Sequence, residues 1–328
     1  MKHNIKILMV LFCTLAGVNY SSGQNTYYGT DAGTGGFQNS NFGYNAGIVL
    51  TGNNNSFFGH FAGKKTTSGN LNFFGGSYSG YENTTGHSNT ALGYYSGYYN
   101  TSGYANVFIG RQSGFKTTTG SANTFLGAYA GLNNTTGTLN VFIGGSTATG
   151  NTTGSQNVCI GYGSGQTIGA GIGNVFIGSY SGQYATGSGK LYIDNSSTSS
   201  PLIYGDFSTD IVAVNGRMGI GTTNVDPTIA LKVNGTVVAK EVLVTVNNFP
   251  DFVFKKDYSL MPLKEVEAYI QKWSHLPSIP AEKQVLEDGL NLAEMNKLLL
   301  QKVEELTLYI IDQDKRIDDL EKKVNKRK

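Results

Sequence analysis

The sequence predicts a mainly β fold: a parallel β-roll, or solenoid, of ten repeats, then a β connector and an α-helical region that ends in a coiled coil. The first observation is the pattern Asn-x-aromatic-Leu/Ile-Gly-x-x-Ala/Ser-Gly, which returns every seventeen residues, and a fixed period of this kind is typical of solenoids. The second is a composition with 45 glycines, 20 tyrosines and only 14% charged residues, unlike that of an ordinary globular enzyme. The third is a heptad pattern near the C-terminus. The strict copies have their central glycine at Gly76, Gly93, Gly110, Gly127, Gly144, Gly161 and Gly178.

Residues 1–23 have the features of a secretory signal peptide. Lys2 and Lys6 precede an apolar run, and small residues follow up to Gly23. We expect cleavage before Gln24, which leaves Cys159 as the single cysteine of the mature chain. Cys159 takes the aromatic position of its repeat, so we expect a buried, unreactive thiol.

Residues 24–187 form the predicted roll, in which three looser copies centred on Gly29, Gly43 and Gly59 precede the seven strict ones. Each unit holds a segment such as Asn-x-Phe-Ile-Gly, which is too short for a helix and rich in β-branched and aromatic residues. It predicts a strand of about four or five residues. The Asn-Thr-Thr-Gly and Ala/Ser-Gly segments predict the corners between strands.

Alternation along each strand separates two apolar faces. Residues such as Val107 and Ile109 share one face, and the central phenylalanine points the opposite way. Because one coil has one interior, we expect the phenylalanine face to point outward and to be covered by identical chains. The alternative is a wider roll that holds both faces inside. The oligomer interface predicted in the roll consists of Phe108, Phe125, Phe142 and Phe176.

Catalytic, cofactor and metal sites are not expected. The roll contains two carboxylates, Asp31 and Glu82, and two histidines, His60 and His87, in different repeats. A glycosidase needs a pair of carboxylates, and a zinc site needs three or four ligands. The net charge of +2 gives no reason to expect a nucleic-acid partner.

The repeated corners carry two further motifs. Asn83, Asn100, Asn134 and Asn151 each begin an N-glycosylation sequon, but they recur at the repeat period, so turn chemistry explains them. Paired threonines at the same corners resemble the threonine ladders of ice-binding solenoids, and we favour the simpler reading of corner residues. The pairs are Thr84–Thr85, Thr118–Thr119, Thr135–Thr136 and Thr152–Thr153.

Tyrosines concentrate at other corners, where we expect them to be exposed. Tyrosine offers a large apolar ring and a polar hydroxyl, which suits binding to a cell surface, matrix or glycan. The candidate surface-binding residues are Tyr94, Tyr95, Tyr98, Tyr99, Tyr129 and Tyr180.

The period ends after Gly182, and residues 188–248 form the predicted β connector. β-branched and aromatic runs between turn signals at Asn215-Gly216 and Asn234-Gly235 predict short strands. The expected strands are 190–194, 201–207, 211–214, 230–233 and 236–246.

Residues 249–290 form a predicted small helical region, and residues 291–328 a coiled coil. Pro262 opens a helix to about Lys272, a short helix covers 281–287, and Asp288-Gly289 ends it. The following heptads have β-branched residues at one core position and leucine at the other, which by themselves favour two strands. Their core residues are Val303, Leu306, Ile310, Ile317, Leu320 and Val324, with Gln313 in the remaining slot.

The repeats resemble the head of trimeric autotransporter adhesins, the YadA-like β-roll. The best copies are Asn123-Thr-Phe-Leu-Gly-Ala-Tyr-Ala-Gly131 and Asn174-Val-Phe-Ile-Gly-Ser-Tyr-Ser-Gly182. The resemblance implies a left-handed roll that assembles as a trimer. We expect an exported protein that is either extracellular or on the cell surface of a Gram-negative-type envelope. The unit here is longer, and phenylalanine replaces the small core residue of that family.

The C-terminal part, from Phe249 to Asp319, resembles the end of tail-fibre-like proteins and, distantly, the self-cleaving chaperones of phage tail spikes. Those chaperones cleave at a Ser-Asp dipeptide, which this sequence lacks. We therefore expect the coiled coil to stay attached.

These observations together predict an exported, fibrous, non-catalytic adhesin-like homotrimer without a membrane-spanning segment after signal removal. The alternatives are a tail-fibre-like component whose head is a spacer, an ice-binding solenoid and, last, an enzyme.

Overall fold

The computed structural model describes residues 19–20, 25–245 and 251–326, and it divides into two compact units at Gly235 and Thr236. Each unit is described by itself. The predicted signal peptide lies outside the described residues except for β1 (Asn19–Tyr20), which pairs antiparallel with β2.

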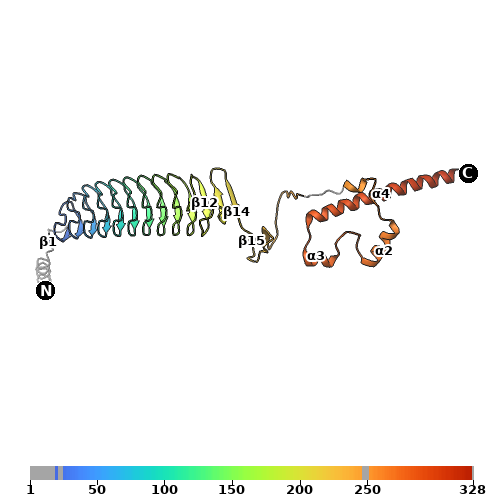
Figure 1. Ribbon diagram of the computed structural model, residues 1–328, viewed down its shortest axis with the longest axis horizontal. Coiled ribbons are helices and arrows are strands. Elements are labelled where there is room, and N and C mark those ends of the chain that lie inside the picture. The colour runs from blue at the N-terminus through green and yellow to red at the C-terminus, as the bar shows by residue number, and fades with distance from the viewer. Residues whose placement is uncertain (1–18, 21–24, 246–250, 327–328) are drawn as a thin grey trace. The chain divides into compact units, whose positions relative to one another are not determined.

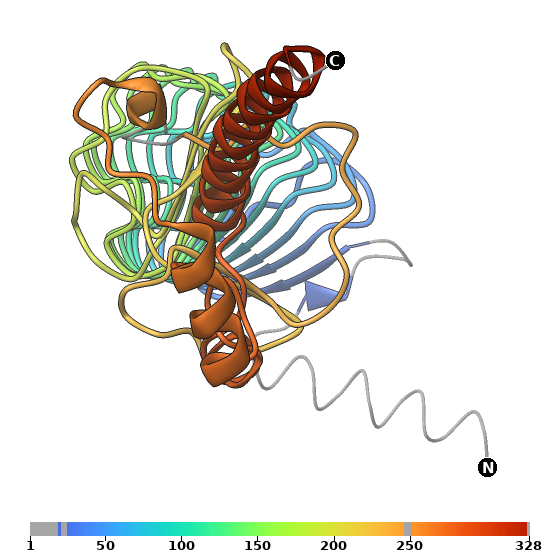
Figure 2. The ribbon, with the colours of Figure 1, turned by 90° about the vertical axis from the view of Figure 1, so that its right-hand side faces the viewer.

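The first unit is a parallel β-solenoid with one three-residue strand in each of the ten predicted repeats, which confirms the predicted fold class. The strands stack in register, so that Val158, Cys159 and Ile160 pair with Val175, Phe176 and Ile177 one repeat later. Figures 1 and 2 show them side by side along one face of the coil. The strands are β2 (Thr26–Tyr28), β3 (Ser40–Phe42), β4 (Ser56–Phe58), β5 (Phe73–Gly75), β6 (Thr90–Leu92), β7 (Val107–Ile109), β8 (Thr124–Leu126), β9 (Val141–Ile143), β10 (Val158–Ile160) and β11 (Val175–Ile177).

The phenylalanine column lies inside the coil of a single chain, so the prediction that it points outward is wrong. The rings stack along the axis, with 4.7 Å between the centroids of Phe125 and Phe142, and the outward neighbour Leu126 is 43% exposed. Alternation defines two faces of a strand but does not say which one the chain closes over. The misassigned residues Phe108, Phe125, Phe142 and Phe176 are all 0–1% exposed.

The glycine of the Ala/Ser-Gly pair makes the room for that ring in most repeats, and Ala148 takes the same position in the repeat of Phe142. Gly131 lies across the coil from Phe125, and a Cβ atom at Gly131 would sit 2.5 Å from the ring. Its backbone also has φ of +59°, a conformation that L side chains rarely adopt. The coil therefore closes over the phenylalanine because the opposite corner has no side chain, or only a single methyl group, at this position.

A ladder of buried asparagines runs beside the phenylalanines. In each rung the Oδ1 atom accepts two hydrogen bonds from the next asparagine: Asn123 accepts from the backbone N–H of Asn140 at 3.0 Å and from its Nδ2 at 3.1 Å. The Asn123 Nδ2 donates to Asn106 Oδ1 at 3.1 Å and to the Gly137 carbonyl at 2.9 Å. The first residue of the motif is thus a buried connector between turns. The ladder comprises Asn39, Asn55, Asn72, Asn89, Asn106, Asn123, Asn140, Asn157 and Asn174.

Three further strands continue the sheet. The strand β12 (Lys190–Ile193) pairs parallel with β11, and β13 (Ile203–Asp206) and β14 (Ile211–Val214) then add antiparallel. Lys190 Nζ lies 2.5 Å from Asp206 Oδ2, and this ion pair, together with hydrogen bonds from Ser208, lowers the pKa of Asp206 to about 2. The antiparallel strands replace the coil at its C-terminal end.

The rest of the connector departs from the prediction. The strand β16 (Leu231–Val233) forms where expected, but it pairs with an unpredicted strand, β15 (Met218–Ile220). The strand expected over 236–246 does not form over 236–245, where Val238 is 94% exposed. Its β-branched residues find no neighbouring strand in the described chain, and a lone strand leaves its backbone groups unpaired.

The second unit contains the short helix η1 (Asp251–Phe254), then α2 (Leu263–Trp273), α3 (Glu282–Asp288) and α4 (Leu292–Asn325). Pro262 precedes α2 and Gly289 follows α3, as predicted. The Asn291 side chain caps α4 by accepting from the backbone N–H of Glu294.

Candidate functional site

A cluster of aromatic side chains in mutual contact on the surface of the roll spans four consecutive repeats, and its members are half-buried except for the exposed Tyr94 and Tyr99. We call it the aromatic corner. Its residues occupy the first, second, fifth and sixth positions after central glycines, so the repeat period places them in columns. The aromatic corner consists of Phe61, Tyr78, Tyr81, Tyr94, Tyr95, Tyr98, Tyr99 and Phe115.

Two pairs of tyrosines stack face to face between neighbouring turns. Tyr78 and Tyr95 have ring centroids 4.9 Å apart with planes 1° from parallel, and Tyr81 and Tyr98 are 5.0 Å apart and 2° from parallel. Tyr78 and Tyr95 also hold φ angles of 60° and 58°, which turns the chain sharply at this corner. The tight turn and the register of the coil fix these rings in place.

Two other tyrosines present their rings differently. The ring of Tyr94 is perpendicular to that of Tyr95, and the ring of Tyr99 lies at 79° to that of Tyr98. Tyr94 and Tyr99 are also 48% and 43% exposed. The aromatic corner therefore offers two exposed rings, and each of them lies at a steep angle to a ring that belongs to a stacked pair.

The Tyr98 hydroxyl remains protonated at physiological pH. Burial, with the nearby Glu82 carboxylate and the Tyr81 hydroxyl, raises the pKa of Tyr98 to about 12. A protonated phenol both donates and accepts hydrogen bonds. The surface therefore suits a polar ligand with hydroxyl or carbonyl groups.

Four of the six predicted surface tyrosines meet in this corner, and two do not. Tyr129 lies one repeat beyond Arg111, whose guanidinium is 5.4 Å from the ring centroid. Tyr180 packs edge-on against Tyr162 at 5.4 Å, several repeats away. The prediction missed Phe61, Tyr78, Tyr81 and Phe115, although they hold the same positions after their central glycines as the four that it found.

Cationic side chains flank the aromatic corner at both ends. Lys64 Nζ lies 4.3 Å from the ring centroid of Phe61, and Lys65 pairs with Glu82 at 2.8 Å in the first half of the corner. Arg111 and Lys116 follow Tyr99 in the next repeat and are exposed. These four flanking cations, Lys64, Lys65, Arg111 and Lys116, are all the lysines and arginines of residues 24–187.

The two histidines of the roll lie in different repeats. His60 packs against the aromatic corner, with its ring centroid 4.0 Å from that of Phe61 and 5.3 Å from that of Tyr78, whereas His87 stacks on Tyr104 at 5.0 Å outside the corner. Among the described residues, no three His, Cys, Asp or Glu side chains gather as metal ligands. Cys159 is fully buried, and burial raises the pKa of its thiol, in agreement with the expected unreactive cysteine.

The sequon asparagines are structural. Asn83, Asn100, Asn134 and Asn151 are 0–2% exposed. Asn151 Nδ2, for example, donates to Asn134 Oδ1 at 2.8 Å and to the Gly154 carbonyl at 3.1 Å. An amide nitrogen held inside the coil in this way is inaccessible to a glycosyl donor in the folded chain.

The hydroxyl groups of the threonine ladder bind backbone carbonyl groups of the neighbouring turn at every first position of a pair. The first threonine of each pair donates its hydroxyl to the next turn, as Thr118 Oγ1 does to the Thr135 carbonyl at 3.2 Å. The second threonines, such as Thr119 and Thr136, are exposed. Half of the hydroxyls are therefore committed to holding the corner.

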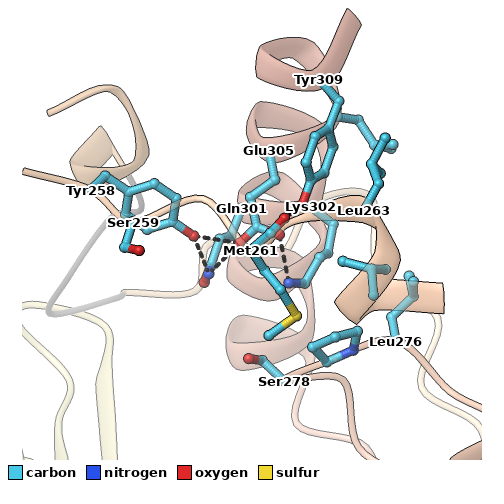
Figure 3. Close-up of a pocket in the computed structure, with 13 residues that line it drawn as sticks. Tyr258, Ser259, Met261, Leu263, Leu276, Ser278, Gln301, Lys302, Glu305 and Tyr309 are labelled. Atoms are coloured by element: carbon cyan, nitrogen blue, oxygen red, sulfur yellow. Dashed lines mark hydrogen bonds and ion pairs between the residues drawn. The ribbon is translucent and has the colours of Figure 1, made fainter. Parts of the chain in front are cut away.

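The helical unit has a cavity of about 230 Å³ beside α4. Figure 3 shows its polar side chains pointing toward one another. Glu305 accepts from Tyr258 at 2.6 Å and from Gln301 at 2.8 Å, and it pairs with Lys302 at 2.7 Å. The Tyr309 hydroxyl donates to the Met261 carbonyl. These polar groups are hydrogen-bonded to one another, and the bonds hold the segment that contains Tyr258 and Met261, just before α2, against α4.

The heptad residues of α4 form a stripe that the described chain leaves open to solvent. Each of them is at least 55% exposed, and Ile310 is 65% exposed. The members of this α4 stripe are Val303, Leu306, Ile310, Ile317, Leu320 and Val324.

No protein-family model, curated protein or solved structure matches the chain. Among the helices in the described ranges, none is both long and apolar enough to cross a membrane.

Proposed function

We propose that this protein is an exported, non-catalytic adhesin-like fibre that assembles as a homotrimer and binds a cell surface, matrix or glycan through the aromatic corner. The observation that carries the proposal is the cluster of tyrosines stacked between consecutive turns, which holds the exposed rings of Tyr94 and Tyr99 in place. Aromatic rings with polar tips are the residues most often enriched at binding surfaces. The predicted signal peptide supports export, and the resemblance to trimeric adhesin heads supports the trimer.

Assembly is assigned to the α4 stripe, since the phenylalanine column is already covered by its own coil. Six apolar side chains at heptad spacing, each more than half exposed, are typical of a coiled-coil seam. Burial of one such side chain in every chain of the assembly contributes roughly 1.5–3 kcal/mol. The seam therefore has the apolar area to hold several chains together.

Replacing Ile310 with aspartate is expected to dissociate the assembly. The charge would lie in the middle of the seam, where burying it without a partner is strongly unfavourable. The mass of the mature protein in solution, measured by light scattering at micromolar concentration, should fall from three chains to one. Ile311→Asp is the matched control, because Ile311 is 44% exposed and lies outside the stripe. A wild-type protein that is already monomeric would contradict the assignment.

Replacing both Tyr94 and Tyr99 with serine is expected to reduce retention of the mature protein on host cells, matrix or glycan-coated surfaces by about tenfold or more, since two exposed aromatic contacts are lost. The matched control replaces Tyr104 and Tyr162, which are 49% and 54% exposed outside the aromatic corner. Equal retention of both variants and the wild type would show that the roll is a spacer, as in a tail-fibre component. Circular dichroism of each variant checks that the roll is intact.

A further inference from the structure

The flanking cations set the chemical class of ligand that the aromatic corner accepts. We propose that it binds a linear polysaccharide in which acidic sugars alternate with neutral ones. This inference rests on the proposed function of the same site and names its ligand.

The charge of the roll is concentrated in one place. Residues 24–187 contain four cations and two carboxylates, and all four cations flank the aromatic corner. Of the carboxylates, Glu82 lies within the corner and pairs with Lys65, while Asp31 belongs to the first repeat. Lys64, Arg111 and Lys116 have no carboxylate partner within ion-pair distance among the described residues. The corner therefore carries an uncompensated positive charge at each end.

The spacing of the charges favours a sparsely charged polymer. Lys64 and Lys116 belong to repeats three turns apart, which is about 14 Å at the usual spacing between strands. Between them lies a row of tyrosines that offers hydrogen bonds and ring surface, and the only carboxylate there is the paired Glu82. A matching ligand has acidic groups separated by neutral, hydroxyl-rich units, and a polysaccharide of alternating acidic and neutral sugars has this order.

Nucleic acid fits the corner less well. Each strand of a duplex carries a negative charge about every 3.4 Å along the axis, so at that spacing most phosphates would lie over the tyrosines and not over the cations. The stacked pairs Tyr78–Tyr95 and Tyr81–Tyr98 also use their ring faces on each other, which leaves few faces for bases. Tyr94 and Tyr99 are the two exposed rings of the corner, and because both lie in one repeat they do not form a row on which successive bases could stack.

The test measures binding of the intact mature protein to hyaluronan oligosaccharides, in which uronic acid alternates with an uncharged sugar. Binding should be saturable and should weaken as salt is raised, because exposed charges are screened. Neutral chitin oligosaccharides should bind at least about tenfold more weakly, and oligo-dT should not bind more tightly than hyaluronan. Tighter binding of oligo-dT or equal binding of the neutral sugar would overturn the proposal.

The variant Lys64→Gln/Lys116→Gln is expected to lose about tenfold in affinity for hyaluronan, because one cation is removed from each end of the corner. The control, Lys240→Gln/Lys256→Gln, removes the same charge from exposed positions outside the roll and should bind as the wild type does. Full affinity of the first variant would overturn the proposal. Loss of surface retention in the Tyr94/Tyr99 variant, with no effect of the lysine changes, would leave the adhesive function standing and remove only the acidic ligand.

Discussion

Replacing Phe125 with alanine is expected to lower the free energy of unfolding of the roll by about 3–5 kcal/mol. Phe125 is completely buried, and its ring stacks between Phe108 at 5.3 Å and Phe142 at 4.7 Å. Truncation removes both contacts and leaves a cavity in the middle of a column. The opposite corner cannot collapse into it, because Gly131 has no side chain to offer.

The measurement is a denaturant titration followed by far-ultraviolet circular dichroism. Tryptophan fluorescence would report on the other unit, since Trp273 is the single tryptophan and lies in α2. Leu126→Ala is the matched control on the same strand, where a 43% exposed side chain should cost under about 1 kcal/mol. A larger loss at Leu126 than at Phe125 would mean that the coil closes over the other face.

The period predicted the strands, and local stereochemistry explains why it did not predict the interior. Val141 and Ile143 are as apolar as Phe142, so hydrophobicity alone cannot rank the two faces of β9. The informative residues are Gly131 and its equivalents, which were interpreted only as corner residues. The equivalent opposite Phe142 is Ala148, so this position holds either no side chain or a single methyl group, and that marks the side on which the ring fits.

The aromatic corner was half predictable for a related reason. Tyr94, Tyr95, Tyr98 and Tyr99 stand out because they are adjacent in sequence, whereas Tyr78 and Tyr81 join them only through the stacking of neighbouring turns. Reading columns across repeats, rather than runs along the chain, would have found all of them. The same alignment of repeats in columns also shows that the flanking cations lie next to the aromatic corner.

The helices were predicted closely because their ends are set locally. Pro262 and Gly289 act within one turn of the backbone. The strand expected at 236–246 required a partner elsewhere in the chain, and local composition contains no information about that partner. The pairing of β15 with β16 was missed for the converse reason, since the short segment Met218–Ile220 gains its order from its neighbour.

Replacing Asn123 with alanine is expected to destabilise the roll by about 4 kcal/mol or more, because several buried polar groups lose partners together. The backbone N–H of Asn140 loses its acceptor. Asn140 Nδ2, the Gly137 carbonyl and Asn106 Oδ1 each lose one hydrogen bond and keep a second one. The unpaired N–H costs roughly 1–3 kcal/mol, since water cannot reach it inside the coil, and each of the three other lost hydrogen bonds adds about 0.5–1.5 kcal/mol. The loss is measured by the same denaturant titration.

Two further variants separate hydrogen bonding from packing at this position. Asn133→Ala removes a half-buried asparagine whose Nδ2 donates only to the Thr149 carbonyl, and it should cost about 1 kcal/mol. Asn123→Asp keeps the shape but places carboxylate oxygens against two acceptors, Asn106 Oδ1 and the Gly137 carbonyl. If the ladder stabilises the roll through its donors, the aspartate variant is at least as unstable as the alanine variant at neutral pH. It should recover in part as the pH falls, because the protonated acid regains one donor. Wild-type stability of Asn123→Asp at neutral pH would show that side-chain volume, and not the ladder of hydrogen bonds, holds the turns in register.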